Sequence, residues 1–200
     1  MLPIKLEGID ESIYAGFWRR FGAFWLDSLI MAPWAILVTY INNAGRLNIL
    51  YTIIPSYLFY FFYSIYCVKR WGGTPGKLIC KIKIINISGH SVGWREAILR
   101  HSIDLLIGIP MMVAIVMVMF GMTDDQYNSM GFMVRSQWIM DKTPIWSKPA
   151  SWIQQIWIWS EFIVLLCNKR RRAIHDFVAG TVVIKKKFEK EAEQAHAADI

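Results

Sequence analysis

Charged side chains stand inside the long apolar segments of this sequence. Arg20 and Asp27 lie seven residues apart in the first such segment, and Asp104 and Glu161 lie in later ones. Seven residues make nearly two helical turns, so Arg20 and Asp27 would share a face but sit about 10 Å apart along the axis. A charge near the centre of a membrane costs about 2.5–3.5 kcal/mol on insertion scales, so such residues usually face protein and serve packing or function.

These acids could form one polar pocket that opens to the cytoplasm. Three predicted helices would each bring one acid to the inner half of a bundle, namely Asp27, Asp104 and Glu161, with Arg20 and Arg100 at the rim. Desolvation favours the protonated form of a carboxylate unless a cation compensates its charge. A group that can hold either a proton or a metal cation is the minimal part of an antiporter, so Asp27→Asn is predicted to abolish cation flux driven by a pH gradient.

Structural roles are the alternative interpretation of the same charges. Arg20 could extend to lipid headgroups, and Asp27 could bridge neighbouring helices. Because Arg20 and Asp27 are too far apart to bond directly, each needs a partner elsewhere. We predict Asp176 as the partner of Arg20, and the third apolar segment as the source of a partner for Asp27, with Arg100 just before that segment as one candidate. Arg100 also stands one helical turn from Asp104 and could pair with that acid.

Motifs for other chemistries are weak. The stretch from Gly73 to Lys77 suggests a phosphate-binding loop, but it lacks the spacing and the hydroxyl residue that such a loop needs. His175 and Asp176 are sequence neighbours that point about 100° apart on a helix, which argues against a catalytic dyad. The three cysteines show no paired spacing, so reduced thiols are expected. We therefore expect no enzyme activity, no cofactor and no metal centre.

Composition indicates a membrane protein of one domain. The 200 residues are 55% hydrophobic and include ten tryptophans, and the excess lies in long apolar runs. The net charge of +7 is typical of cytoplasmic loops that contact anionic lipid. Nucleic-acid binding is not expected, because no nucleic-acid motif accompanies the charge.

Four apolar segments predict four membrane-spanning helices, at about 21–41, 49–68, 103–121 and 151–167. The first has the roughly 20 residues that cross a hydrocarbon core of about 30 Å. The predicted fold class is all-α, a polytopic membrane helical bundle with short cytoplasmic interfacial elements. Around the membrane domain, 16–184, we expect a lead-in at 1–15 and a charged, solvated tail at 185–200.

The connecting segments differ in pattern. Alternating lysine and isoleucine at 78–85 predict a short strand or extended segment on the membrane surface. We predict an interfacial helix at 92–100, a polar loop at 123–150, and a second amphipathic return segment at 173–184.

The distribution of lysine and arginine predicts the orientation. Of the 22 basic residues, the loops on one side of the predicted bundle hold only Arg46, Arg135, Lys142 and Lys148. Basic residues concentrate on the cytoplasmic side of membrane proteins. We therefore expect a multi-pass protein of the inner (plasma) membrane with both termini in the cytoplasm.

Three blocks of the sequence resemble the RDD family of membrane proteins. The first is Ala15-Gly16-Phe17-Trp18-Arg19-Arg20 with Asp27, the second is Gly73-Thr74-Pro75-Gly76-Lys77 with the segment that follows it, and the third begins at His175-Asp176-Phe177. They occur in family order and cover about 15–184. The family is named for an arginine and two aspartates, and the matching positions are Arg20, Asp27 and Asp176. The long segment 123–150 departs from the family pattern.

The resemblance implies a membrane fold and, from some members, a link to cation/proton antiport. The leading expectation is transport of cations or small solutes in exchange for protons, with a polar site drawn from Arg20, Asp27, Arg100, Asp104, Glu161 and Asp176. The alternative is a non-catalytic membrane scaffold or assembly partner. Four spans in 200 residues are few for a transporter, so either function could require a homo-oligomer.

Overall fold

The computed structural model describes residues 13–167 and 171–192, apart from the side chains of residues 161, 162 and 165. These residues divide into two compact units, which are described separately. Unit 1 contains the start of the chain up to Ile30, Phe61–Ile103, and the chain from Ile158 onward. Unit 2 contains Met31–Tyr60 and Asp104–Trp157, so the long helices each contribute to both units.

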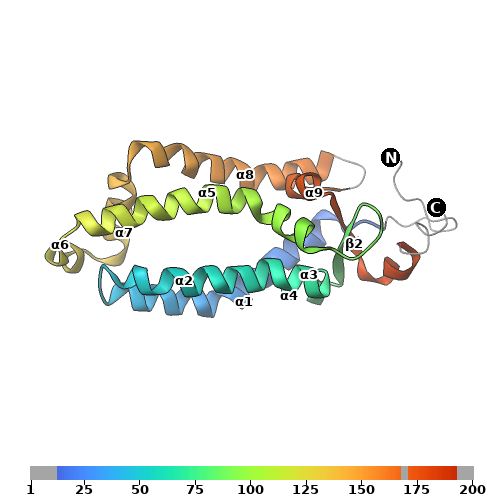
Figure 1. Cartoon of the computed structure of the whole chain (residues 1–200), viewed down its shortest axis with the longest axis horizontal. Helices are drawn as coiled ribbons and strands as arrows, with labels where there is room; N and C mark the ends of the chain where they lie inside the picture. Colours follow the sequence, from blue (N-terminus) through green and yellow to red (C-terminus); the bar gives the residue numbers. More distant parts are fainter. Residues whose placement is uncertain (1–12, 168–170, 193–200) are drawn as a thin grey trace. The chain divides into compact units, whose positions relative to one another are not determined.

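Three long helices carry the apolar segments (Figure 1). They are α1 (Phe17–Asn43), the continuous run of α2 (Asn48–Tyr60), the π-helix η1 (Phe61–Tyr66) and α3 (Cys67–Trp71), and α5 (Trp94–Gly121). Each is long and apolar enough to cross a membrane. Large apolar side chains on all three are exposed, for example Leu29, Ile54 and Leu106, as expected for surfaces that face lipid.

The predicted fourth span corresponds to α8 (Lys148–Cys167), a helix of 20 residues. It is not among the three helices that meet the length and hydropathy expected of a membrane span in the described part of the chain. The first three predicted spans are therefore confirmed as long apolar helices, and the count of four remains a prediction. The predicted interfacial helix at 92–100 is the first part of α5 rather than a separate element.

Unit 1 also contains a two-stranded antiparallel sheet of β1 (Ile82–Asn86) and β2 (Thr181–Lys185). Their register pairs Ile82 with Lys185 and Asn86 with Thr181. The strand predicted at 78–85 is confirmed as β1, but the all-α class overlooked its partner. The segment 173–184, predicted as one amphipathic return segment, instead contains α9 (Ile174–Ala179) with its N-cap residue Ala173, a turn and most of β2.

The chain on both sides of the predicted membrane domain packs onto this sheet. The amide of Ala15 donates to the carbonyl of Val183, and the amide of Lys185 donates to the carbonyl of Ile13. After β2, the 3-10 helix η3 (Lys186–Phe188) buries Phe188, and Ala192 is fully buried. In the described part of the tail that was predicted as solvated, Phe188 and Ala192 are therefore packed, whereas Lys186, Lys187 and Lys190 are exposed.

Unit 2 closes one end of its helices with short helical elements in the segment predicted as a polar loop. These elements are α6 (Asp124–Ser129), α7 (Phe132–Lys142) and η2 (Ile145–Ser147). Thr123 starts α6 through a capping box with Gln126, which satisfies amides that the first helical turn leaves open. The guanidinium of Arg135 stacks 4.0 Å from the ring of Tyr127, and Tyr127 packs in a hydrophobic cluster with Val118, Met119 and Met122 at the end of α5.

Candidate functional site

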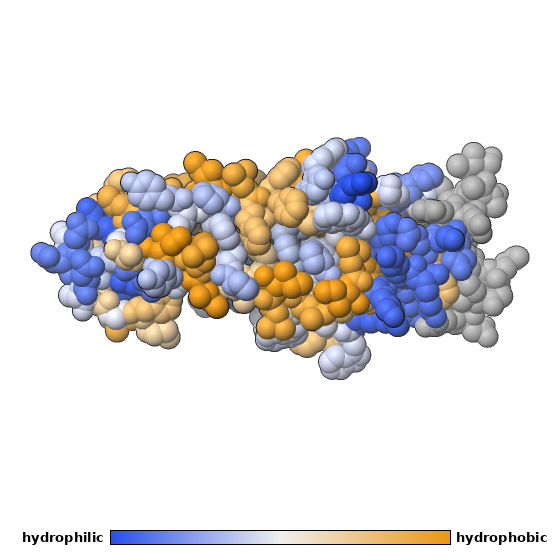
Figure 2. Space-filling model, turned by 90° about the horizontal axis from the view of Figure 1, so that it is seen from below, coloured by the Kyte–Doolittle hydropathy of each residue, from blue (hydrophilic) through white to orange (hydrophobic). Residues whose placement is uncertain are grey.

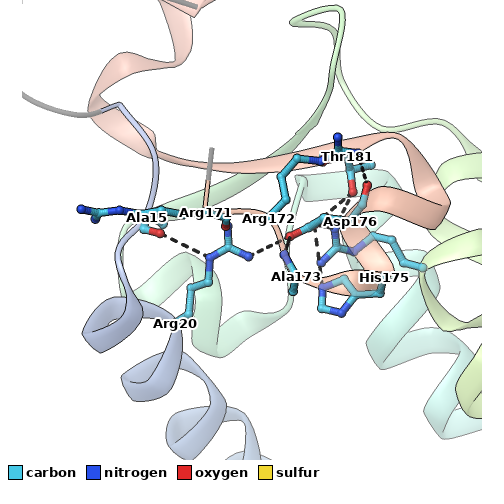
Figure 3. Close-up of polar contacts among 9 residues, drawn as sticks. Ala15, Arg20, Arg171, Arg172, Ala173, His175, Asp176 and Thr181 are labelled. Atoms are coloured by element: carbon cyan, nitrogen blue, oxygen red, sulfur yellow. Dashed lines mark hydrogen bonds and ion pairs between the residues drawn. The ribbon is translucent and has the colours of Figure 1, made fainter. Parts of the chain in front are cut away.

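Asp176 is the centre of a buried polar cluster in unit 1, and its side chain is fully buried. It occupies the first turn of α9, where its Oδ2 accepts a bond of 3.0 Å from the amide of Ala173. The Nη1 atom of Arg20 donates to the same oxygen at 2.8 Å. Arg100 of α5 and the hydroxyl of Thr181 both donate to Oδ1. Figure 3 shows Arg20 pointing from α1 toward Asp176.

Two arginines therefore compensate one buried carboxylate. Burial alone would raise the pKa of Asp176, but the charges of Arg100, His175 and Arg20 hold the pKa well below its usual value. Arg100 has a relative exposure of 3%, so removing the acid would leave its charge buried and uncompensated. This cluster joins α1, α5 and α9, and it confirms the predicted partnership of Arg20 with Asp176.

Asp27 forms a second polar site of unit 1, between α1 and the loop that carries Gly73 to Lys77. Its Oδ1 accepts from the hydroxyl of Tyr63 at 2.6 Å and from the amide of Gly76 at 2.7 Å. Its Oδ2 accepts from the hydroxyl of Thr74 at 2.6 Å. The predicted partnership of Asp27 with Arg100 is wrong, because these donors surround Asp27 while Arg100 binds Asp176 and Thr181.

The loop motif has a structural explanation at this site. Thr74 and Pro75 begin the short helix α4 (Pro75–Ile79), so the carboxylate of Asp27 accepts from an amide of its first turn. A Cβ atom on Gly76 would lie 2.6 Å from both the carbonyl oxygen of Ala23 and Oδ1 of Asp27. Glycine at position 76 therefore permits the close approach of the loop to α1. Residues Gly73 to Lys77 therefore anchor a loop to α1, which agrees with their poor match to a phosphate-binding loop.

Lys77, also in α4, was overlooked as a site residue because the sequence offered it only as part of a phosphate loop. It is half-buried. Burial and the neighbouring charges of Arg100 and Arg20 lower its pKa to about 8, against the opposing influence of Asp27 and Asp176. Lys77 thus adds a third cation to the two acid sites of unit 1.

Asp104 belongs to unit 2, where it lines a cavity of about 280 Å³. The cavity is lined by Ser56, Tyr57, Tyr60, Asp104, Leu105 and Gly108. The indole nitrogen of Trp157 in α8 donates to Oδ1 of Asp104 at 3.1 Å. Tyr57 and Tyr60 were not predicted as site residues, because no charge marks them in the sequence.

The predicted pocket of three acids remains a prediction. Asp27 and Asp104 lie in different compact units, and the side chain of Glu161 lies outside the described residues. Within the described part of the chain, no group of three His, Cys, Asp or Glu side chains is arranged to hold a metal ion.

Comparison with known proteins decides the family. The sequence model of the RDD family matches residues 14–180, which include both polar sites of unit 1 and the cavity of unit 2. The chain belongs to the RDD family. The structure divides Arg20, Asp27 and Asp176, the charged residues on which the resemblance was based, between two clusters.

Two relatives from Bacillus subtilis (strain 168) support this family membership. The protein named "Uncharacterized protein YxaI" is 26% identical over 133 residues, which are 54% of this chain and 86% of that protein. The protein named "Uncharacterized membrane protein YteJ" is 21% identical over 184 residues, covering 88% of this chain and 83% of that protein. No solved structure matches the chain. This RDD protein is an integral membrane protein.

Proposed function

We propose that this RDD protein moves cations or small solutes across the membrane in exchange for protons. The observation that carries the proposal is the position of Asp104, a carboxylate that lines a cavity among apolar helices. Ser56, Tyr57 and Tyr60, three residues that carry hydroxyl groups, also line this cavity. Carboxylate and hydroxyl oxygens are suitable ligands for hard cations, and a carboxylate can exchange such a cation for a proton.

Asp104 is a better transport residue than Asp27. Both carboxylate oxygens of Asp27 accept short bonds from α4, its N-cap residue and Tyr63, so a cation there would have to displace donors that hold a loop in place. Asp104 instead stands beside open volume. We therefore assign exchange to Asp104 and anchoring of the loop to Asp27.

Flux across proteoliposomes tests the proposal. Purified protein is reconstituted, a pH gradient is imposed, and proton movement is followed on addition of Na⁺, K⁺ or Li⁺. Wild type is expected to show cation-dependent proton flux. Asp104→Asn is expected to reduce this flux at least about tenfold, because the variant lacks the carboxylate that holds the proton or the cation in our proposal. Asp125→Asn removes an exposed acid of the same unit and is the matched control that retains flux.

The opposite outcomes would reject the proposal. If vesicles with wild-type protein show no more proton flux than protein-free vesicles with any of the cations, the protein does not exchange these cations for protons. Equal flux from wild type and Asp104→Asn would assign transport to another site.

A membrane scaffold is the second proposed function, because the most heavily bonded acids hold elements together. Asp176 joins α1, α5 and α9, and Asp27 joins α1 to α4 and η1. A scaffold is expected to co-purify with a partner in fixed stoichiometry and to give no flux. We further propose a multi-pass arrangement in the plasma membrane with cytoplasmic termini, with assembly into a homo-oligomer.

A further inference from the structure

Unit 1 has a basic cavity of about 590 Å³ that neither polar cluster uses. It is lined by Arg19, Leu78, Ile79, Lys81, Lys186 and Lys187. Four cationic side chains and two apolar ones therefore face the same space. Its volume falls within the range of roughly 300–1,000 Å³ that is usual for small-molecule sites.

The sheet of unit 1 brings these distant residues together. Ile82 pairs with Lys185 at the end of the ladder, and the amide of Lys186 donates to the carbonyl of Lys81 at 2.9 Å. Lys81 adopts a left-handed backbone with φ of 55°, where the chain turns from α4 into β1. Arg19 comes from the first turn of α1, beside the Arg20 that Asp176 holds. The pairing of the strands and the position of α1 therefore bring the four cationic residues of the cavity together.

The cavity lies where apolar and polar surface meet. Trp18, next to Arg19 in α1, is 79% exposed, and Ile79 in the cavity lining is 60% exposed. Exposed tryptophans at the ends of membrane helices are typical of the headgroup level. Figure 2 shows hydrophobic surface adjoining the hydrophilic surface at the end of unit 1 that carries β2. An occupant of this cavity would therefore be amphipathic.

We propose that this cavity binds an anionic phospholipid, with the phosphate held by Arg19, Lys81, Lys186 and Lys187 and the upper acyl chain against Leu78 and Ile79. Cationic donors bind phosphate oxygens through charge-assisted hydrogen bonds. Basic pockets beside membrane helices on the cytoplasmic side are a known way to recognise anionic headgroups. A soluble phosphate would use the same cations, but it would leave the exposed apolar lining without a function. The proposal does not depend on the transport activity proposed above.

Native mass spectrometry of the full chain in detergent, titrated with phosphatidylglycerol or phosphatidylcholine, tests the site. The variant Lys186→Gln with Lys187→Gln removes two charges from the cavity. The control Arg70→Gln with Lys190→Gln removes two exposed charges from the same unit outside the lining. Both variants are first compared with wild type by thermal unfolding, and a cavity variant that melts early is replaced by Lys81→Gln alone.

Wild type and control are expected to bind phosphatidylglycerol more tightly than phosphatidylcholine. The cavity variant is expected to lose affinity for phosphatidylglycerol by roughly 30-fold, about fivefold for each lysine, and raised salt is expected to weaken the wild-type complex. Equal affinity of the cavity variant and the control would overturn the proposal. Glycerol phosphate that binds wild type as tightly as the lipid does would also overturn it, because the site would then recognise a soluble anion.

Discussion

Asp176 is central to the packing of unit 1, because its carboxylate compensates the buried guanidinium group of Arg100 and the partly buried one of Arg20. We expect Asp176→Asn to lower the free energy of unfolding by about 3–5 kcal/mol, the usual cost of removing one partner of a buried ion pair. Asp124→Asn is the matched control, since its ion pair with Arg46 involves an acid side chain that is 73% exposed. That control should cost about 0–1 kcal/mol. Chemical unfolding in detergent measures both.

The pH dependence of the unfolding free energy of wild type and of Asp176→Asn gives a second check on this cluster. Because the pKa of Asp176 is held below its ordinary value of 3.8, its ionised form stabilises the folded protein above that value. This stabilisation is lost as the pH falls through the lower pKa of the folded state. The stability difference between wild type and Asp176→Asn should therefore shrink in strong acid. A constant difference at every pH, or equal costs for Asp176→Asn and Asp124→Asn, would contradict the assigned cluster.

Lys77 gives a prediction of the same sign in the alkaline range, because its pKa is also lowered in the folded protein. Burial lowers its pKa from 10.5 to about 8, so between these values the unfolded chain binds more protons than the folded one. Wild-type stability relative to Lys77→Met should be constant below about pH 8 and should rise as the pH increases toward 10.5. Thermal unfolding of both proteins across this range measures the difference. Parallel profiles would show that Lys77 keeps the same proton affinity in both states.

The spacing of charges predicted one of these residue partnerships and could not predict the other. Arg20 and Asp27 were recognised as too far apart to bond, which directed attention to Asp176 as a partner for Arg20. The donors to Asp27 are Tyr63, Thr74 and a backbone amide, all neutral groups. A search for opposite charges therefore pointed to Arg100 in error.

At the scale of elements, the contact of α4 with α1 depends on the absence of a side chain at position 76. Gly76→Ala would place a Cβ 2.6 Å from the carbonyl oxygen of Ala23, which is backbone and cannot move independently. We expect a loss of about 1–3 kcal/mol in unfolding free energy, as for other overpacked sites.

Gly73→Ala is the control for this loop. A Cβ there would first meet the side chain of Lys77 at 3.4 Å, an ordinary contact distance. Its unfolding free energy should therefore remain closer to that of wild type than that of Gly76→Ala. If the two variants unfold alike in the same detergent, the close approach of α4 to α1 is not what requires glycine.

The sequence predicts best those elements in which apolar and polar residues repeat with one clear period. The lysine–isoleucine alternation revealed β1, whereas β2 is buried at all five of its positions and so shows no alternation. The short helices α6 and α7 were taken for a loop because polar residues start and flank them, although the capping residues Thr123 and Gln126 were visible in the sequence. The cavity at Asp104 was missed because it depends on tertiary packing.

At the scale of the whole molecule, the distribution of basic residues predicts which side of the membrane each terminus occupies. Epitope tags at the two ends are expected to resist protease added outside intact cells and to be cleaved once the cells are opened. A tag inserted at Asn128, an exposed position of α6, should be cleaved from outside. Cleavage of either terminal tag in intact cells would contradict the proposed orientation.

The central claim is that Asp104 holds either a proton or a cation. Infrared difference spectroscopy of the reconstituted protein can follow the carbonyl band of a protonated carboxylic acid as cation is added at constant pH. We predict that the band decreases in wild type and in Asp125→Asn, and that this decrease is absent in Asp104→Asn. A spectrum that no cation changes, or a decrease that persists in Asp104→Asn, would contradict the claim.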